Sequence, residues 1–139
     1  MKKIFTLLLL AVFCFGCSSD DDNDPDTSKT DPDIPATESL KGQTFYSFVR
    51  TEDAYIEVYD VYRVFSFTSD TDVIEHQAKG TPDGDTLYLP NKGKYAYSHP
   101  DLQFRIHDNL DFDFIATMND EKTEFTYSNP GKSYTFKKK

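Results

Sequence analysis

The sequence predicts an all-β domain, an antiparallel meander of eight or nine strands that closes into a barrel; a two-sheet sandwich is the alternative way to bury the same apolar face. Two observations support this fold class. Of the 12 Phe and 9 Tyr residues, all except Phe5, Phe13 and Phe15 lie after residue 37, where they recur at alternate positions. No stretch of this region keeps a helical period for three turns. We therefore expect strands with one apolar face throughout residues 38–139.

The expected strands follow one another along the whole domain. Each is a run rich in aromatic and β-branched residues, which suit the half-buried surface of a sheet. The second run is long enough to bend or split near Asp60, so the number of strands is eight or nine. The predicted ranges are, in chain order, 43–51, 55–68, 72–79, 86–89, 94–99, 102–107, 111–118, 123–128 and 133–137.

Three of the predicted hairpins can be checked by register, because a correct turn brings apolar residues opposite one another. In each case one face of the hairpin is apolar and the other polar, which predicts a sheet with one dry and one wet face. The expected pairs are Tyr97–Phe104 and Tyr95–Ile106 around Pro100-Asp101, Ala116–Phe125 and Phe114–Tyr127 around Asp120-Glu121, and Phe125–Phe136 and Tyr127–Tyr134 around Pro130-Gly131.

The start of the chain has the pattern of a lipoprotein signal peptide. A basic start is followed by an apolar run, residues 4–15, which is shorter than the roughly 20 residues that span a bilayer. Gly16 provides the small residue that processing needs before Cys17, whereas the rival Cys14 follows the bulky Phe13. We therefore predict a signal peptide at residues 1–16 and lipidation, by palmitate or a similar acyl chain, at Cys17.

The residues after Cys17 are acidic. Ser19, Asp20, Asp21 and Asp22 resemble the export signal of Bacteroidetes surface lipoproteins, in which a short acidic run directs the lipoprotein to the outer face of the outer membrane. The resemblance implies a membrane-anchored protein exposed at the cell surface. Retention on the periplasmic face is the alternative.

Residues 17–37 are predicted to be the lipidated cysteine and a disordered acidic tether, rich in Asp, Ser, Thr and Pro. Ile34 is the single large apolar side chain after Cys17 in this segment. The segment therefore cannot bury enough apolar surface to offset the entropy of ordering. A flexible chain of this length reaches on the order of 25 Å. The predicted domain is then residues 38–139.

Charge and cysteine content exclude several functions. The formal net charge is −9, or −11 after removal of Lys2 and Lys3 with the signal, and no basic stripe suits a phosphate backbone, so nucleic acid is not an expected partner. Neither cysteine lies in the domain, which therefore has no disulfide and no thiol chemistry. About 100 residues suffice for one domain held by its own core.

Within the domain the chain resembles small Bacteroidetes lipoproteins with a lipocalin-like meander barrel. The matching patterns belong to strands and turns, so the resemblance implies a barrel and says nothing about a ligand. The Gly-x-Trp signature of true lipocalins is missing, because the chain has no Trp. The patterns are Leu40-Lys41-Gly42, Phe65-Ser66-Phe67-Thr68-Ser69-Asp70, Gly93-Lys94-Tyr95-Ala96-Tyr97 with Pro100 beyond, and Gly131-Lys132-Ser133-Tyr134-Thr135-Phe136.

No residue pattern in the domain indicates catalysis, a metal or a cofactor. His76, His99 and His107 do not converge in the predicted register, and a zinc site would need at least two of them together. Asp111 and Asp113 have a spacing that glycosidases use, but they alternate with core-facing Phe residues and so should face water. We expect a protein that is not an enzyme.

Two short acidic loops and one tripeptide are the remaining candidate sites in the domain. Residues 69–72 and 83–85 could offer oxygen ligands to Ca²⁺ but lack the spaced ligands and distal Glu of a calcium loop, so we interpret them as solvated turns. Asp85-Thr86-Leu87 matches the O-glycosylation acceptor pattern of the same bacterial group, which makes Thr86 a candidate for modification.

Two functional classes remain, and they differ in the role of the aromatic residues. In the favoured one, the rings fill the barrel and the protein is an interaction or accessory module that meets a protein partner through exposed tyrosines, foremost Tyr55 and Tyr59. In the alternative, the rings line a cavity for a small hydrophobic ligand. The candidate lining residues are Tyr95, Tyr97, Phe104, Phe112, Phe114, Tyr127 and Tyr134.

Overall fold

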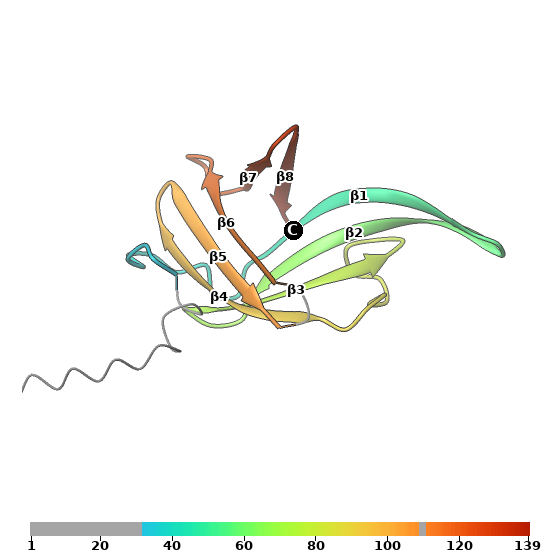
Figure 1. The fold of residues 1–139 in the computed structure, drawn as a ribbon, viewed down its shortest axis with the longest axis horizontal. Coiled ribbons are helices and arrows are strands. Elements are labelled where there is room, and N and C mark those ends of the chain that lie inside the picture. The colour runs from blue at the N-terminus through green and yellow to red at the C-terminus, as the bar shows by residue number, and fades with distance from the viewer. Residues whose placement is uncertain (1–31, 109–110) are drawn as a thin grey trace, which may run out of the picture.

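The computed structural model describes residues 32–108 and 111–139, and this part of the chain folds as a closed antiparallel barrel without helices (Figure 1). Each strand pairs with the next, and β1 also pairs with β8. The predicted closed meander is therefore confirmed over its two-sheet alternative. The strands are β1 (Thr44–Ala54), β2 (Glu57–Phe67), β3 (Asp72–Lys79), β4 (Asn91–Ser98), β5 (Asp101–His107), β6 (Asp111–Met118), β7 (Glu124–Asn129) and β8 (Lys132–Lys138).

One of the nine predicted strands is absent, and the long second strand is not split. The range 86–89 is not a strand: Thr86 forms only an isolated bridge to Ala78, within a loop so tight that a Cβ on Gly84 would meet the Lys79 carbonyl oxygen at 1.7 Å. The range 55–68 does not split at Asp60: β2 is one strand, and a register shift in β1 lies opposite its residues Val61 and Tyr62. β1 and β2 form one long hairpin that reverses at Tyr55 and Ile56. Because 86–89 is not a strand, eight of the nine predicted strands remain.

The register predictions are confirmed for one hairpin and corrected for two. Phe125 lies opposite Phe136, as expected. In the β4–β5 hairpin Tyr95 lies opposite Phe104 rather than Ile106, because Ser98 and Asp101 pair and the chain reverses at the residues between them.

The β6–β7 hairpin is corrected in the same way. Met118 rather than Ala116 lies opposite Phe125, because the loop has four residues, 120–123, and Lys122 adopts a left-handed φ of 55°. Each correction moves the pairing by two residues in total. Since side chains alternate with period two, the apolar residues stay on the predicted face.

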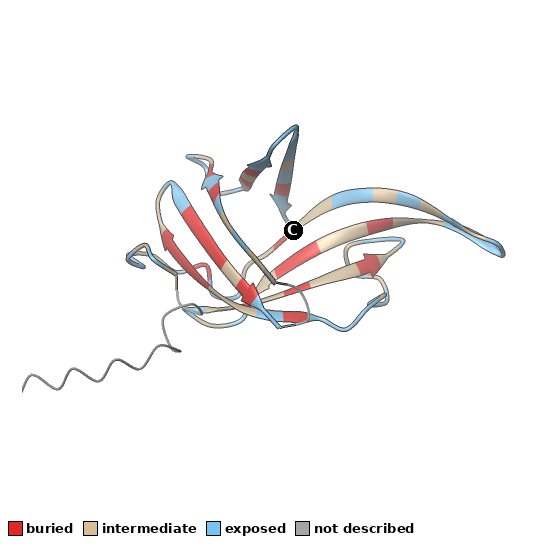
Figure 2. Ribbon diagram, in the orientation of Figure 1, coloured by how far each residue is buried: buried red, intermediate tan, exposed pale blue. Residues whose placement is uncertain are grey.

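Aromatic rings in mutual contact fill the barrel. The ring centroid of Phe104 lies 5.0 Å from that of Phe65, 5.9 Å from Phe67, 4.6 Å from Phe114 and 5.5 Å from Phe125. Buried positions alternate with less buried ones along β7, whereas β4 and β5 each carry a run of three buried residues, as the red bands of Figure 2 show. Rings at these spacings contribute attractive edge and offset-stacking contacts in addition to the burial of apolar area.

The chain before β1 packs against the same core. Leu40 is buried, and its backbone N–H donates a hydrogen bond to the Tyr95 hydroxyl at 3.1 Å. Further upstream, the N–H of Asp33 donates to Oε1 of Gln103 at 2.8 Å. Residues within 32–37 thus contact the barrel, upstream of position 38 where the sequence prediction begins the domain.

At two seams of the barrel, where neighbouring strands meet, few residues are paired. Where β8 meets β1, and again where β6 meets β7, only two residue pairs form within the described chain. In Figure 1 the β7–β8 hairpin diverges from both neighbours, and the far half of the β1–β2 hairpin extends beyond the barrel. The seam pairs are Phe45–Lys138 and Tyr46–Lys137, and Thr117–Thr126 and Met118–Phe125.

A matched pair of phenylalanine substitutions tests whether the ring cluster stabilises the fold. Phe104→Ala should lower the free energy of unfolding by about 3–5 kcal/mol, because it removes a fully buried ring and leaves a cavity. Phe48→Ala should cost under about 1 kcal/mol, because Phe48 is 52% exposed. Chemical denaturation measures both, and equal losses would contradict the assignment of Phe104 to the core.

Candidate functional site

The most prominent surface feature is the far half of the β1–β2 hairpin, residues 50–60, which we call the arm. It lies beyond Tyr46, the last β1 residue paired with β8, and before Val61, the first β2 residue paired with β3. The arm is therefore a two-stranded ribbon that projects from the barrel (Figure 1). Its residues form no part of the hydrophobic core.

The tip of the arm exposes apolar side chains. Tyr55 is fully exposed, Ile56 is 87% exposed and Val58 is 67% exposed. Three large apolar side chains near one hairpin end are unusual for a solvated turn, where small and polar residues predominate. Grouped exposed apolar side chains are typical of surfaces that contact a protein, a membrane or a ligand.

The two tyrosines predicted as a partner surface have different environments. Tyr55 lies at the tip, whereas Tyr59 is half-buried under Lys79, whose Nζ lies 4.5 Å from the ring centroid. Lys79 is also paired with Glu57, and this hydrogen bond raises the pKa of the lysine. Tyr59 thus fastens the base of the arm to β3, while Tyr55 is available at its end.

Ile56 and Val58 are not among the site residues predicted from the sequence. The predicted strands 43–51 and 55–68 place the turn at residues 52–54, a few residues too early, because the actual reversal at Tyr55 and Ile56 contains no Gly, Pro, Asn or Asp. No local signal marked this turn. Only the pairing of β1 with β2 identifies it.

The seven residues predicted to line a ligand cavity divide into two groups. Tyr95, Tyr97 and Phe104 are at most 1% exposed and belong to the packed core. The others form a ladder of adjacent rings near the β6–β7 seam, with centroids 4.3–5.4 Å apart. Of these, Tyr127 is buried and the rest are partly exposed. The ladder is Phe112, Phe114, Tyr127 and Tyr134.

A buried polar cluster lies inside the barrel wall next to this ladder. Glu75 on β3 is 1% exposed; its Oε1 lies 3.0 Å from Nε of Arg63, and its Oε2 accepts a hydrogen bond from Nδ2 of Asn91 at 2.6 Å. Burial raises the pKa of Tyr127, and the positive charge of Arg63 opposes that shift. Pairing with the guanidinium of Arg63 offsets part of the free-energy cost of burying the Glu75 carboxylate.

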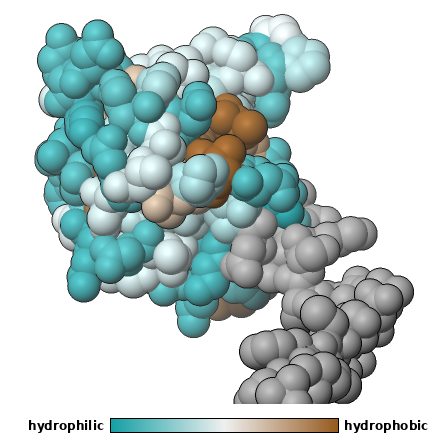
Figure 3. Space-filling model, turned by 90° about the vertical axis from the view of Figure 1, so that its left-hand side faces the viewer, coloured by the Kyte–Doolittle hydropathy of each residue, from teal (hydrophilic) through white to brown (hydrophobic). Residues whose placement is uncertain are grey.

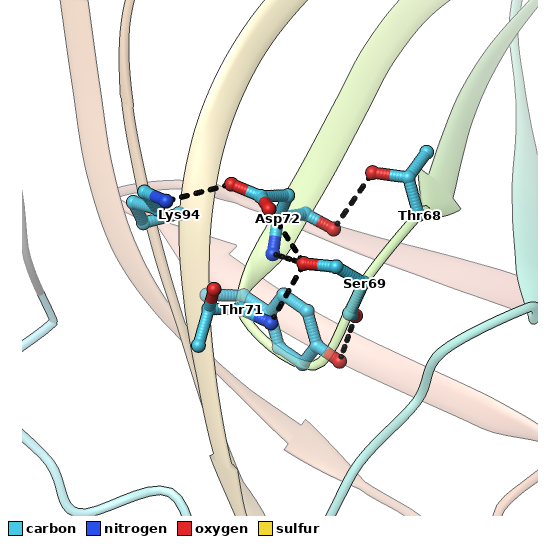
Figure 4. Close-up of polar contacts among 6 residues, drawn as sticks. Thr68, Ser69, Thr71, Asp72 and Lys94 are labelled. Atoms are coloured by element: carbon cyan, nitrogen blue, oxygen red, sulfur yellow. Dashed lines mark hydrogen bonds and ion pairs between the residues drawn. The ribbon is translucent and has the colours of Figure 1, made fainter.

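The acidic turn between β2 and β3 uses its oxygens internally (Figure 4). The Ser69 hydroxyl donates to Oδ2 of Asp72 at 2.5 Å and accepts from the N–H of Asp72 at 2.9 Å and of Thr71 at 3.2 Å. Lys94 on β4 donates to Oδ1 of Asp72 at 2.7 Å, and this bond, followed by that from Ser69, lowers the pKa of the Asp72 carboxyl. The turn is therefore a connection between strands.

The histidines have separate partners. Nδ1 of His99 lies 2.9 Å from the Tyr97 hydroxyl, and Nε2 of His107 lies 3.1 Å from Oδ1 of Asp113. His76 is half-buried on β3, and its burial lowers its pKa. No group of three or more metal-ligating side chains occurs among residues 32–108 and 111–139. Asp113 is exposed, as expected; the side chain of Asp111 is outside the described part.

An outer groove of about 310 Å³ crosses β4 and β5. Three of its charged residues are in ion pairs: Lys94 with Asp72, and Arg105 with Asp33 and Asp113, while the backbone N–H of Lys92 donates to Oδ2 of Asp108 at 3.4 Å. A groove with this balance of charges does not select an anion. The lining residues are Asp72, Lys92, Gly93, Lys94, Arg105, His107 and Asp108.

The side of the molecule that faces away from the arm is mostly hydrophilic or neutral, with one small hydrophobic patch (Figure 3). Thr86 is exposed in the loop between β3 and β4, so its predicted modification is sterically possible and stays a prediction. Cys17, Ser19, Asp20, Asp21 and Asp22 lie outside the described residues. Within those residues, no helix is long and apolar enough to span a bilayer.

Comparison with known proteins adds no relative. No family model, curated protein or solved structure matches the chain. The arm, with its exposed tip, is therefore the candidate site on the strength of its geometry.

Two isosteric substitutions test whether the internal ion pair is structural. Glu75→Gln should lower the free energy of unfolding by about 2–4 kcal/mol, because it leaves the Arg63 charge without its buried partner. Glu57→Gln, which breaks the exposed pair with Lys79, should leave the free energy of unfolding nearly unchanged. Denaturant titration compares them, and similar stabilities of the two variants would contradict a structural role for the cluster.

Proposed function

We propose that this protein is a lipid-anchored outer-membrane lipoprotein that works without catalysis, as an interaction module at the cell surface. The anchor is Cys17, and the acidic run from Ser19 to Asp22 supports export to the outer face. The tether would hold the barrel clear of the membrane. The periplasmic face is the alternative location.

The observation that carries the interaction role is the arm. Apolar side chains are exposed at its tip, while the barrel interior is already filled by contacting rings. An exposed apolar end on a projecting ribbon can be buried only against another molecule. We therefore infer that the arm contacts a protein partner, with Tyr55 and Ile56 at the centre of the contact.

The alternative role, a barrel that binds a small hydrophobic ligand, has less support. A ligand at the barrel centre would have to displace rings whose centroids lie about 5 Å apart, which dense cores resist. The partly exposed rings of the ladder are the remaining place for such a ligand. The arm explains more of the exposed apolar surface than the ladder does.

Site-specific crosslinking tests the arm. A photoreactive phenylalanine analogue at position 55 of the full chain, expressed in the source bacterium, should give a discrete crosslinked species on intact cells. The same analogue at position 88 is the matched control, because Tyr88 is 59% exposed but lies outside the arm. Absence of any adduct at 55, or equal adducts at 55 and 88, would argue against the arm as the contact.

The anchor has its own test. Cys17→Ala should move the protein from the membrane fraction to the soluble fraction and abolish labelling with radioactive palmitate, because a single lipidated cysteine provides the attachment. Cys14→Ala is the control and should leave both unchanged. Lipid labelling that survives Cys17→Ala would refute the assigned anchor.

A further inference from the structure

The arm has an edge that is not paired along most of β1. Within the described residues, β8 pairs with β1 only at Phe45 and Tyr46, so the edge from Ser47 to Ala54 has no strand beside it. Such an edge presents backbone N–H and C=O groups that can pair with another strand. A β-bulge between Phe48 and Arg50 interrupts the start of this edge, and the regular part begins at Arg50.

Side-chain directions limit how a second copy could pair with this edge. Arg50, Glu52 and Ala54 share the face of Val61 and Tyr59, while Thr51 and Asp53 lie on the other face. Two antiparallel strands related by a twofold axis place residues of the same face opposite each other. Only registers centred on a residue meet this condition, and Arg50, Thr51 and Glu52 are the possible centres in the middle of the edge.

Charge selects one of these three registers. A centre at Arg50 puts two arginines opposite each other, and a centre at Glu52 puts two glutamates opposite each other; both are unfavourable. A centre at Thr51 pairs Arg50 of each copy with Glu52 of the other and brings the two Thr51 residues together, which is a favourable cross-strand pair. The edge is thus self-complementary in a single register.

The lengths also fit. With Thr51 at the centre, residues 50–52 of the two copies pair, and the bulge between Phe48 and Arg50 shifts the register beyond them. Tyr55 of one copy then lies near the part of the other β1 where pairing with β8 begins, at Tyr46. The apolar tip would then lie beside the other barrel instead of in water. The charged side chains are accessible for pairing, since those of Arg50 and Glu52 are 41% and 35% exposed.

We propose that the partner of the arm is a second copy of this chain, joined by antiparallel pairing of the two β1 edges about Thr51. The proposal rests on the arm being the interaction element. Anchoring both copies to one membrane raises their effective concentration, so a contact that is weak in solution suffices at the surface.

Charge reversal tests the pairing with purified full-length chains in detergent, in two populations labelled for energy transfer. The parent should self-associate. Arg50→Glu alone and Glu52→Arg alone should each weaken self-association by roughly tenfold or more, because each places like charges opposite one another twice per dimer. An equimolar mixture of the two variants should recover the association, because each charge then meets its opposite.

The mixture of the two variants distinguishes a loss of pairing between copies from a loss of stability within one chain. The ion pair within one chain, between Nη2 of Arg50 and Glu52 at 2.6 Å, is lost in both variants and is not restored by mixing them. Thr51→Pro, which removes the central N–H donor, should also prevent association while circular dichroism stays that of a β protein. A parent without energy transfer up to roughly 1 mM, or a mixture no tighter than the single variants, would overturn the proposal.

The crosslinking at position 55 distinguishes failure of this inference from failure of the proposed function. An adduct with twice the mass of the chain supports the paired copies. An adduct with a different protein would overturn the second copy as partner while retaining the arm as the interaction element. No adduct at all would remove both.

Discussion

The contact of Phe104 with the rings of its neighbours is the interaction on which the rest of the structure depends. Phe65, Phe114 and Phe125 come from three other strands, so one ring cluster joins β2, β5, β6 and β7. The barrel has few hydrogen-bonded pairs at two of its seams. Packing of the rings therefore stabilises a barrel whose backbone pairing is short at these two seams.

The short pairing at the two seams leaves two groups of residues exposed at the surface. Because β8 leaves β1 after two residue pairs, the β1–β2 hairpin continues beyond the barrel as the arm. Because β7 leaves β6 equally soon, Phe112, Phe114 and Tyr134 remain partly exposed beside the polar cluster of Glu75. In a barrel paired along the whole length of both seams, neighbouring strands would cover the β1 edge and these rings. The positions where strand pairing stops therefore determine which of these residues are exposed.

The proposed interaction role and the proposed pairing of two copies both depend on the arm. A projecting ribbon with an apolar tip and a free edge offers two modes of contact, side-chain burial and strand pairing, on one element. A lipid anchor and a tether would bring such arms together on one surface, where weak contacts gain from proximity. The barrel then serves as a rigid base, with Tyr59 and Lys79 fastening the arm to β3.

The sequence by itself determined the fold class, the eight or nine strands and the core face shared by the aromatic residues of the hairpins within residues 94–137, because these depend on alternation, which is a local property. Its errors in the β4–β5 and β6–β7 registers were shifts of two residues, which keep every side chain on its face. Tertiary structure alone decided the turn at Tyr55 and Ile56, the length of the arm and the burial of Glu75. These depend on which strands pair and where pairing stops, and that is set by packing between residues far apart in the chain.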